Sequence, residues 1–195
     1  RDVKELVRDW ILDERISVTA TGLKRTANSN AWNGGAHTAT SPITETSSIT
    51  GVRCRDGGGT TWIFFGLSHG NTSSHHNDID FAFYWNNGAV YIYENSDNRG
   101  STGATYTRGV SVGEVRVNRA TGMVEYLLDD VVKYTSTKTV TFPLKVDVSL
   151  YKKNNDTLSD IQYTAFPWYD VPCRLTSSDG TVGEGRIGYR YAPLA

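Results

Sequence analysis

The feature that most constrains the fold is a change of hydrophobic period near residue 16. From Ile16 onward, apolar and polar residues alternate in short runs rich in Val, Ile, Tyr and Phe, and clusters of Gly, Asn, Asp and Ser separate these runs. A period of two places successive side chains on opposite faces of a strand, and half-buried antiparallel strands carry this pattern. The sequence therefore predicts an all-β protein built as an antiparallel β-sandwich.

Several segments have the length and composition of strands. They cover residues 17–21, 49–53, 61–68, 78–85, 89–94, 115–118, 123–128, 131–136, 145–151 and 158–164. Asn86-Asn87-Gly88 and Asp129-Asp130 stand between consecutive segments, where tight hairpins need residues that tolerate positive φ. The sandwich is thus predicted over residues 17–164, and we interpret residues 165–195 as an extended C-terminal segment.

The first residues follow the period of a helix instead. Apolar side chains recur with the spacing i, i+3, i+4, i+7, i+8 at Val3, Leu6, Val7, Trp10 and Ile11. Asp2 and Glu5 fit a capping box at the start of such a helix. The pattern predicts a short amphipathic helix over residues 2–14, within an N-terminal unit of residues 1–16. Its apolar stripe either covers this chain's own sandwich or docks on a neighbouring subunit.

Composition excludes two classes of partner. Lys and Arg number 20 and Asp and Glu number 21, a net charge of -1, so no strong positive field attracts nucleic acid. No apolar run approaches the ~20 residues that cross a bilayer. We therefore expect no nucleic-acid partner and no membrane insertion. The 19 Gly and single Met favour a β-rich secreted protein, located outside the cell or at the cell surface.

The two cysteines and two glycosylation triplets also bear on whether the protein is secreted. Cys54 and Cys173 alone cannot form a four-ligand zinc site, so one long-range disulfide is predicted, with two buried free thiols as the alternative. Asn71 and Asn155 each begin a glycosylation triplet, which matters only in a secretory pathway. A start at Arg1 is expected of a processed mature form or of an excised piece of a larger protein.

Several runs between residues 63 and 163 share their order and spacing with a known family. They read FFGLS at 64–68, DIDFAFY at 78–84, VYIYEN at 90–95, GEVRV at 113–117 and PLKVDVSL at 143–150. In these runs the sequence resembles the concanavalin A-like jelly-roll domains of extracellular adhesion and carbohydrate-binding proteins. The resemblance covers about residues 17–164. It implies a jelly-roll sandwich and a carbohydrate or glycoprotein ligand.

The same resemblance bears on catalysis. Catalytic β-glucanases of this fold class place three acids at alternating positions of one strand. Here Asp78 and Asp80 occupy the corresponding run, but Ala82, or Phe83 if the strand is bulged, replaces the third acid. Glycoside hydrolysis by this route then lacks its general acid. We therefore predict no enzyme activity and assign no catalytic residue.

No cofactor or metal ligand is assigned either. His75 and His76 stand beside Asp78, but we interpret this stretch as an exposed loop. The pair Asp78 and Asp80 is similar to the metal ligands of legume lectins, which also need ligands from a loop that is not identifiable here. Bound Ca²⁺ therefore remains only an alternative.

Alternation predicts a ligand-binding face on the outer side of one sheet. Ile79, Phe81, Phe83, Val90 and Ile92 are assigned to the core, and the residues between them face outward. Tyrosines beside carboxylates can stack on the C–H faces of sugars and bond their hydroxyls. The predicted ligand-binding residues are Asp78, Asp80, Tyr84, Tyr91, Tyr93 and, at the border, Arg99. Cross-strand tyrosine pairing that only stabilises the sheet is the alternative, and the faces of Trp62 and Trp85 are left open.

These features predict a non-catalytic, secreted or surface-displayed lectin-like module that binds glycans or mediates adhesion. The rival hypothesis is a structural subunit of an extracellular filament or sheath, which self-associates through its N-terminal helix and C-terminal extension.

Overall fold

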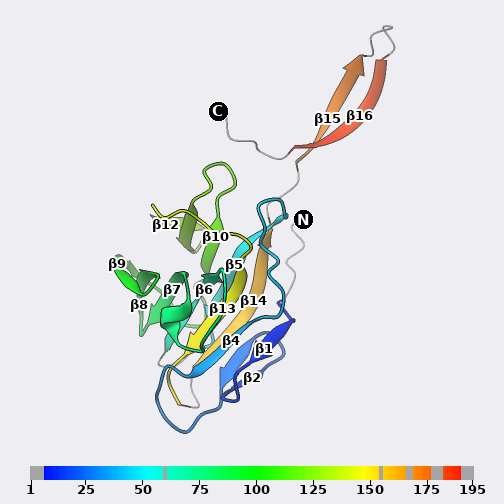
Figure 1. The fold of residues 1–195 in the computed structure, drawn as a ribbon. Helices are drawn as coiled ribbons and strands as arrows, with labels where there is room; N and C mark the ends of the chain where they lie inside the picture. The colour runs from blue at the N-terminus through cyan, green and yellow to red at the C-terminus, as the bar shows by residue number, and fades with distance from the viewer. Residues whose placement is uncertain (1–6, 59–60, 154–155, 166–168, 177–181, 190–195) are drawn as a thin grey trace.

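Two seven-stranded antiparallel sheets, packed face to face, make up the body of the molecule (Figure 1). The computed structural model describes residues 7–58, 61–153, 156–165, 169–176 and 182–189. Among these residues there is no α-helix, and one 3-10 helix, η1, spans His76–Asp78. The predicted all-β sandwich is therefore confirmed.

Sheet I has the strand order β1-β4-β13-β6-β7-β8-β9. Its strands are β1 (Trp10–Leu12), β4 (Gly34–Thr38), β6 (Trp62–Ser68), β7 (Phe81–Asn86), β8 (Ala89–Glu94), β9 (Asp97–Thr105) and β13 (Lys145–Leu150). Sheet II has the order β12-β11-β10-β5-β14-β3-β2. Its strands are β2 (Ile16–Val18), β3 (Leu23–Arg25), β5 (Ile49–Asp56), β10 (Gly113–Val117), β11 (Val124–Leu128), β12 (Val131–Thr135) and β14 (Thr157–Ala165).

The main core lies between the two sheets, and period-two alternation fills it. Phe81, Phe83 and Trp85 of β7 point inward with Val90 and Ile92 of β8. The predicted inward direction of Phe81, Phe83, Val90 and Ile92 is confirmed. Trp85, whose face the sequence left open, is a core residue. A side chain at Gly113 would collide with this packing, since a Cβ there would lie 2.7 Å from the Trp85 ring. Close approach of the sheets therefore requires glycine at this position.

The predicted N-terminal helix is wrong wherever the structure describes that stretch. Residues 7–9 are irregular and β1 pairs with β4, Trp10 opposite Thr38. Residues 2–6 lie outside the described residues. Val7 is buried in the core, whereas Ile11 is 49% exposed. Pairing with the edge of β4 gives the backbone its hydrogen bonds and buries Val7 against this chain's own sandwich, and such tertiary contacts override a short helical period.

Other differences concern strand limits. The strand predicted from residue 78 begins at Phe81, because Asp78 belongs to η1. Asn95 and Ser96, both at positive φ, form the turn that joins β8 to β9. Hairpin turns with positive φ at Asn87 and at Asp129-Asp130 are confirmed.

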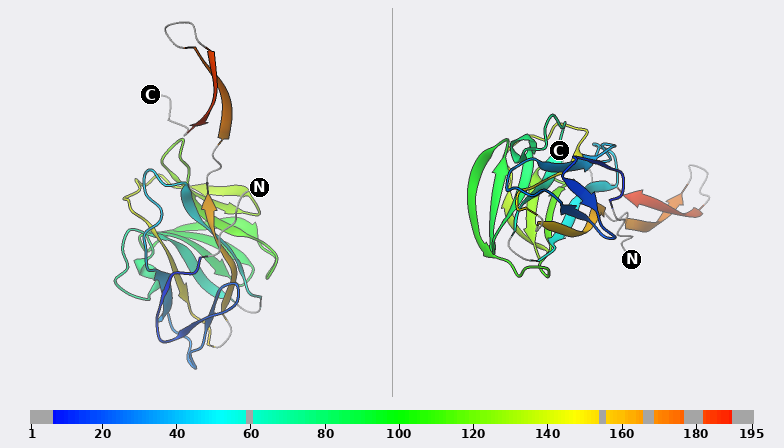
Figure 2. Two further views of the ribbon diagram at one scale, coloured as in Figure 1. Left: turned by 90° about the vertical axis from the view of Figure 1, so that its right-hand side faces the viewer. Right: turned by 90° about the horizontal axis from the view of Figure 1, so that it is seen from below.

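The C-terminal segment contributes a separate ribbon. Among the described strands, β15 (Tyr169–Thr176) and β16 (Val182–Tyr189) pair only with each other. All views place this ribbon beyond one end of the sandwich (Figure 2). Cys54 is a buried free cysteine, so the predicted disulfide to Cys173 is not seen, and the side chain of Cys173 lies outside the described residues. Burial raises the pKa of the Cys54 thiol well above its usual value.

Candidate ligand-binding face

Aromatic side chains gather on the outer face of sheet I. The register places Tyr84 of β7 opposite Phe64 of β6 and Tyr91 of β8, while Tyr93 lies opposite Ala82. Because residues opposite one another point to the same side of a sheet, these rings share one face. The predicted outward direction of Tyr84, Tyr91 and Tyr93 is thus confirmed. Ile79 also packs on this outer side, so its assignment to the main core is wrong.

Two loops extend this group of rings. Trp32, which precedes β4, lies 6.0 Å from Tyr84 and 4.8 Å from Tyr151 between ring centroids. Tyr151 follows β13 and lies 4.9 Å from Trp62 at the start of β6. We name this surface the aromatic platform, and its members are Trp32, Trp62, Phe64, Tyr84, Tyr91, Tyr93 and Tyr151.

The platform has a buried base and accessible rings around it. Phe64 is 1% exposed and Tyr84 is 9% exposed, and their rings stack in parallel at 4.1 Å. Burial and the neighbouring Tyr93 raise the pKa of the Tyr84 hydroxyl, which therefore stays protonated. Tyr91 and Tyr93 are half-buried. A ligand on this face would touch the half-buried rings, while Tyr84 mainly supports them.

The two predicted ligand-binding acids hold a loop in place. The Asp78 carboxylate accepts hydrogen bonds from the Thr72 amide at 2.6 Å, the Thr72 hydroxyl at 2.7 Å and the Ser73 amide at 3.2 Å. Asp80 accepts one from the His69 amide at 2.7 Å. Burial by itself would raise the pKa of Asp78, but these hydrogen bonds outweigh it and lower that pKa. Both acids therefore organise residues 69–80, which we call the crossing loop.

The crossing loop lies against the outer face of sheet I. Its His76 ring stacks on Phe64 with the centroids 4.4 Å apart. A Cβ at Gly35 would lie 2.7 Å from the Ser74 Cα, so β4 needs glycine where the loop passes over it. Burial and the neighbouring His75 lower the pKa of His76 to about 4. The His76 ring is therefore neutral at pH 7 and packs as an aromatic group.

A carboxyl group is buried beside the loop. Asp147 of β13 is 3% exposed and accepts a hydrogen bond from the Ser68 hydroxyl at 2.9 Å. Burial, opposed by the Ser68 hydrogen bond and reinforced by the charge of Asp78, raises the pKa of Asp147 to about 8. At pH 7 this carboxyl is therefore largely protonated, which no feature of the sequence indicated.

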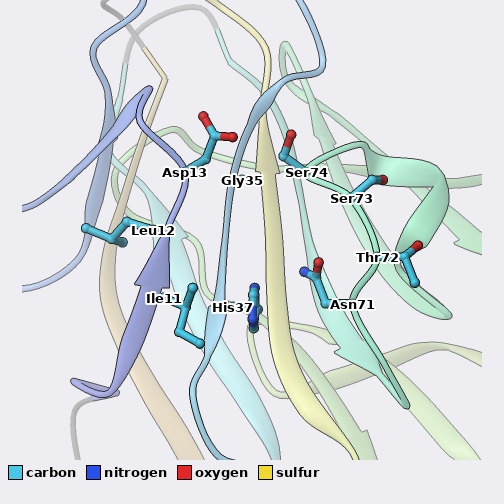
Figure 3. A pocket seen from close by; sticks show the side chains of 9 residues that line it. All are labelled: Ile11, Leu12, Asp13, Gly35, His37, Asn71, Thr72, Ser73 and Ser74. Atoms are coloured by element: carbon cyan, nitrogen blue, oxygen red, sulfur yellow. The ribbon is translucent and has the colours of Figure 1, made fainter.

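A groove of about 230 Å³ opens on the other side of the crossing loop. In Figure 3, Ile11 and Leu12 of β1 form one wall, His37 of β4 lies at the centre, and the loop from Asn71 to Ser74 forms the other wall. Burial and the nearby Lys145 lower the pKa of His37. Sequence reasoning missed this groove, because it predicted β1 as a helix and marked Asn71 only as a glycosylation acceptor. Asn155 lies outside the described residues.

Arg99 does not join the tyrosines. Its guanidinium lies 3.1 Å from the carboxylate of Glu94. Glu94 is fully buried and its neighbour across the ladder is the core residue Phe81, so its side chain points to the inner face of β8. The side chain of Arg99 therefore serves an internal ion pair, on the opposite face from Tyr91 and Tyr93.

Within the part of the chain that the structure describes, no cluster of three or more His, Cys, Asp or Glu side chains is arranged to hold a metal ion. None of the described residues belongs to a helix that is long and apolar enough to span a membrane.

Comparison with known proteins identifies the fold. No protein-family model matches the sequence, and no curated protein sequence matches it. Among solved structures, the potassium-bound carbohydrate recognition domain of Emp46p aligns with a TM-score of 0.60 and 12% identity over 81% of this chain and 88% of that chain. The protein has the concanavalin A-like jelly-roll fold. The resemblance predicted from the sequence is thus confirmed for the fold.

Other structures of this fold carry different activities. The exoplasmic/lumenal domain of VIP36, in a form bound to Ca²⁺ and Man3GlcNAc, aligns with a TM-score of 0.54 and 10% identity, over 80% of this chain and 82% of that chain. The alginate lyase from Corynebacterium sp. aligns with a TM-score of 0.51 and 16% identity, over 77% of this chain and 81% of that chain. One fold thus serves binding and catalysis, so function must be argued from the residues of the outer face.

Proposed function

We propose that the protein is a non-catalytic lectin-like module, extracellular or at the cell surface, which binds a carbohydrate or glycoprotein ligand through the aromatic platform. The observation that carries this proposal is the row of half-buried rings on one rigid sheet face. Structures of the same fold support it, since Emp46p contributes a carbohydrate recognition domain and VIP36 was solved with Man3GlcNAc.

The platform has the chemistry that sugars require. Pyranose rings present apolar C–H faces, which pack on Tyr and Trp rings, and hydroxyl groups, which bond with the phenol groups of Tyr91 and Tyr93. Both tyrosines project from β8, whose backbone is paired on each side by β7 and β9. Their positions are fixed before the ligand arrives, so little conformational entropy is lost on binding.

A glycan array with the purified protein tests this proposal. We expect binding to a subset of glycans and a loss of at least about tenfold in affinity for the double variant Tyr91→Ala/Tyr93→Ala. Tyr134→Ala is the matched control, because Tyr134 is a half-buried tyrosine on sheet II. A correctly folded protein that binds no glycan, or that loses nothing with the double variant, contradicts the proposal.

The absence of catalysis is a separate part of the proposal. Asp78 and Asp80 accept hydrogen bonds from the crossing loop, which ties them to its structure. We expect no reducing ends and no unsaturated products when the protein is incubated with β-glucans or alginate. Turnover that persists through purification and disappears in Asp80→Asn would show that the protein is an enzyme.

A role in assembly is the second candidate function, and the ribbon β15–β16 favours it. A two-stranded ribbon is marginally stable in water when it has no further sheet to pack on. The ribbon pairs with neither sheet of the sandwich, so contact with a neighbouring copy would stabilise it. Light scattering on the full chain and on residues 1–165 tests this. Equal monomeric masses for both would remove the assembly hypothesis.

A further inference from the structure

A tight turn after β13 brings a lysine to the edge of the aromatic platform. The buried carboxylate of Asp156 accepts hydrogen bonds from the amides of Tyr151 at 2.8 Å, Lys152 at 2.6 Å and Trp62 at 3.2 Å. One carboxylate therefore fixes the turn and the first residue of β6 to each other. The positions of Tyr151, Lys152 and Trp62 are set by the same group.

The ammonium group of Lys152 covers one of the platform rings. It lies 4.0 Å from the centroid of Trp62 and 5.9 Å from that of Tyr151. Among the described residues no carboxylate forms an ion pair with Lys152, and the charge of Asp156 is directed at backbone amides. Arg99 on β9, by contrast, is paired with Glu94. Within the described part of the chain, the Lys152 ammonium is thus held at the aromatic platform by two rings and by no carboxylate.

This arrangement favours one class of ligand. A cation over an exposed ring is held weakly, and an anion within hydrogen-bond distance attracts it more strongly because the bond is charge-assisted. A ligand that carries an anionic group would draw the ammonium off the Trp62 ring. The uncovered ring would then be free to pack against an apolar sugar face.

We propose that the platform binds an anionic saccharide, whose carboxylate or sulfate group pairs with the Lys152 ammonium while its sugar ring packs on Trp62 and Tyr151. This inference rests on the proposed function and narrows its ligand class. In the free protein Lys152 shields Trp62, and in the complex it supplies the charge that selects the ligand. A neutral sugar leaves the ammonium over the ring and reaches only the other rings of the platform.

Matched oligosaccharides of equal length test the proposal by calorimetry. The probes are a neutral glucan, a uronate oligosaccharide, a sialylated glycan and a sulfated glycan. We expect at least one anionic probe to bind about tenfold more tightly than the neutral one, with an advantage that shrinks at high salt. The anionic probe that responds identifies whether a carboxylate or a sulfate group is recognised.

Charge variants separate the role of Lys152 from a general effect of positive charge. Lys152→Gln is expected to abolish the preference for the anionic probe by lowering the affinity for that probe to the level of the neutral glucan. Lys153→Gln removes the same charge from the next residue, which is exposed and lies over none of the described rings, and it should retain most of the preference. Thermal melting of each variant confirms that the turn is intact.

The outcomes separate this inference from the proposed function. Equal affinity of the wild-type protein for neutral and anionic probes, or equal losses in Lys152→Gln and Lys153→Gln, would overturn the inference and leave glycan binding intact. Failure of the folded protein to bind any saccharide would overturn both.

Discussion

Each outer face of the sandwich contains one buried acidic side chain, and the two acids have different partners. On sheet II, Glu114 is 3% exposed, lies opposite Arg53 and approaches Arg116 at 3.5 Å. On sheet I, Asp147 is equally buried, but it has the Ser68 hydroxyl for a partner and Asp78 as a neighbouring charge. Burial raises the pKa of both acids, and only Glu114 has arginines that oppose the shift.

The other side chains of the two faces differ in the same way, with ion pairs on sheet II and aromatic rings on sheet I. Sheet II continues its cross-strand ion pairs, since Arg116 lies 2.9 Å from Glu125 on the next strand. Cross-strand pairs of opposite charge stabilise such a face. Sheet I instead carries the stacked rings of the platform and the crossing loop. Among the described residues, sheet II thus presents ion pairs between neighbouring strands, whereas sheet I presents half-buried rings and the Lys152 ammonium above one of them.

The largest expected effect comes from removing the base of the platform. Phe64→Ala deletes a buried ring that stacks on Tyr84 and His76, so we expect the free energy of unfolding to fall by about 3–5 kcal/mol. Val132→Ala, at an exposed position of sheet II, should cost less than about 0.5 kcal/mol. Urea denaturation measures both. Equal losses would show that the two faces do not differ in packing.

Asp147→Asn tests the buried acid of sheet I. The folded protein binds the Asp147 proton with a pKa of about 8, against an ordinary value of 3.8, so the proton stabilises the fold fully below about pH 4. That stability is lost as the pH rises toward 8. The asparagine variant should lack this part of the pH dependence and be more stable than the wild type at pH 8 by a few kcal/mol, since one pKa unit is about 1.4 kcal/mol.

Urea denaturation at pH 4.5, 6 and 8 gives the change of the unfolding free energy with pH for the wild type and for Asp147→Asn. Glu114→Gln is the control from sheet II. Because Arg53 and Arg116 lose their partner in this variant, its gain in stability at pH 8 should be smaller than that of Asp147→Asn. If Asp147→Asn leaves the slope unchanged, the carboxyl group is not protonated in the folded protein.

Asp78→Asn is expected to destabilise the protein, whereas Asp147→Asn stabilises it at high pH, and the size of the change should be intermediate. The pKa of Asp78 is lowered in the fold, so its contribution to stability is present at neutral pH and is lost as the pH falls through the folded pKa. Weakening its hydrogen bonds to the crossing loop should cost about 1–2 kcal/mol at pH 7. Faster hydrogen exchange at the Thr72 and Ser73 amides would report it, and unchanged exchange would contradict the role of Asp78 in the loop.

The smallest effect is expected at the ion pairs of sheet II. Glu125→Gln removes one partner of Arg116, a pair near the surface, and should cost less than about 1 kcal/mol. The difference from the wild type should shrink in 1 M salt, where the Debye length is ~3 Å. A larger, salt-independent loss would mean that this network supports the fold as strongly as the platform does.

The direction in which the strand side chains point follows from the sequence alone. Phe83 and Ile92 face inward and Tyr84 and Tyr91 face outward because alternation is a local property of an extended chain. The turn at Asn87-Gly88 then aligns β7 with β8, which places the tyrosines side by side. The class of fold and one row of the candidate site follow from this local rule.

Long-range strand pairing brings distant segments together on that face, and no local pattern predicts these pairings. Trp32 and Tyr151 join the platform because β4 and β13 are neighbours in sheet I, and β1 becomes a strand because the edge of β4 is free to pair with it. Asp78 accepts hydrogen bonds from the crossing loop, and Arg99 forms an ion pair with the buried Glu94. The alternation of a strand fixes the direction of a side chain, but long-range packing selects the group that it meets.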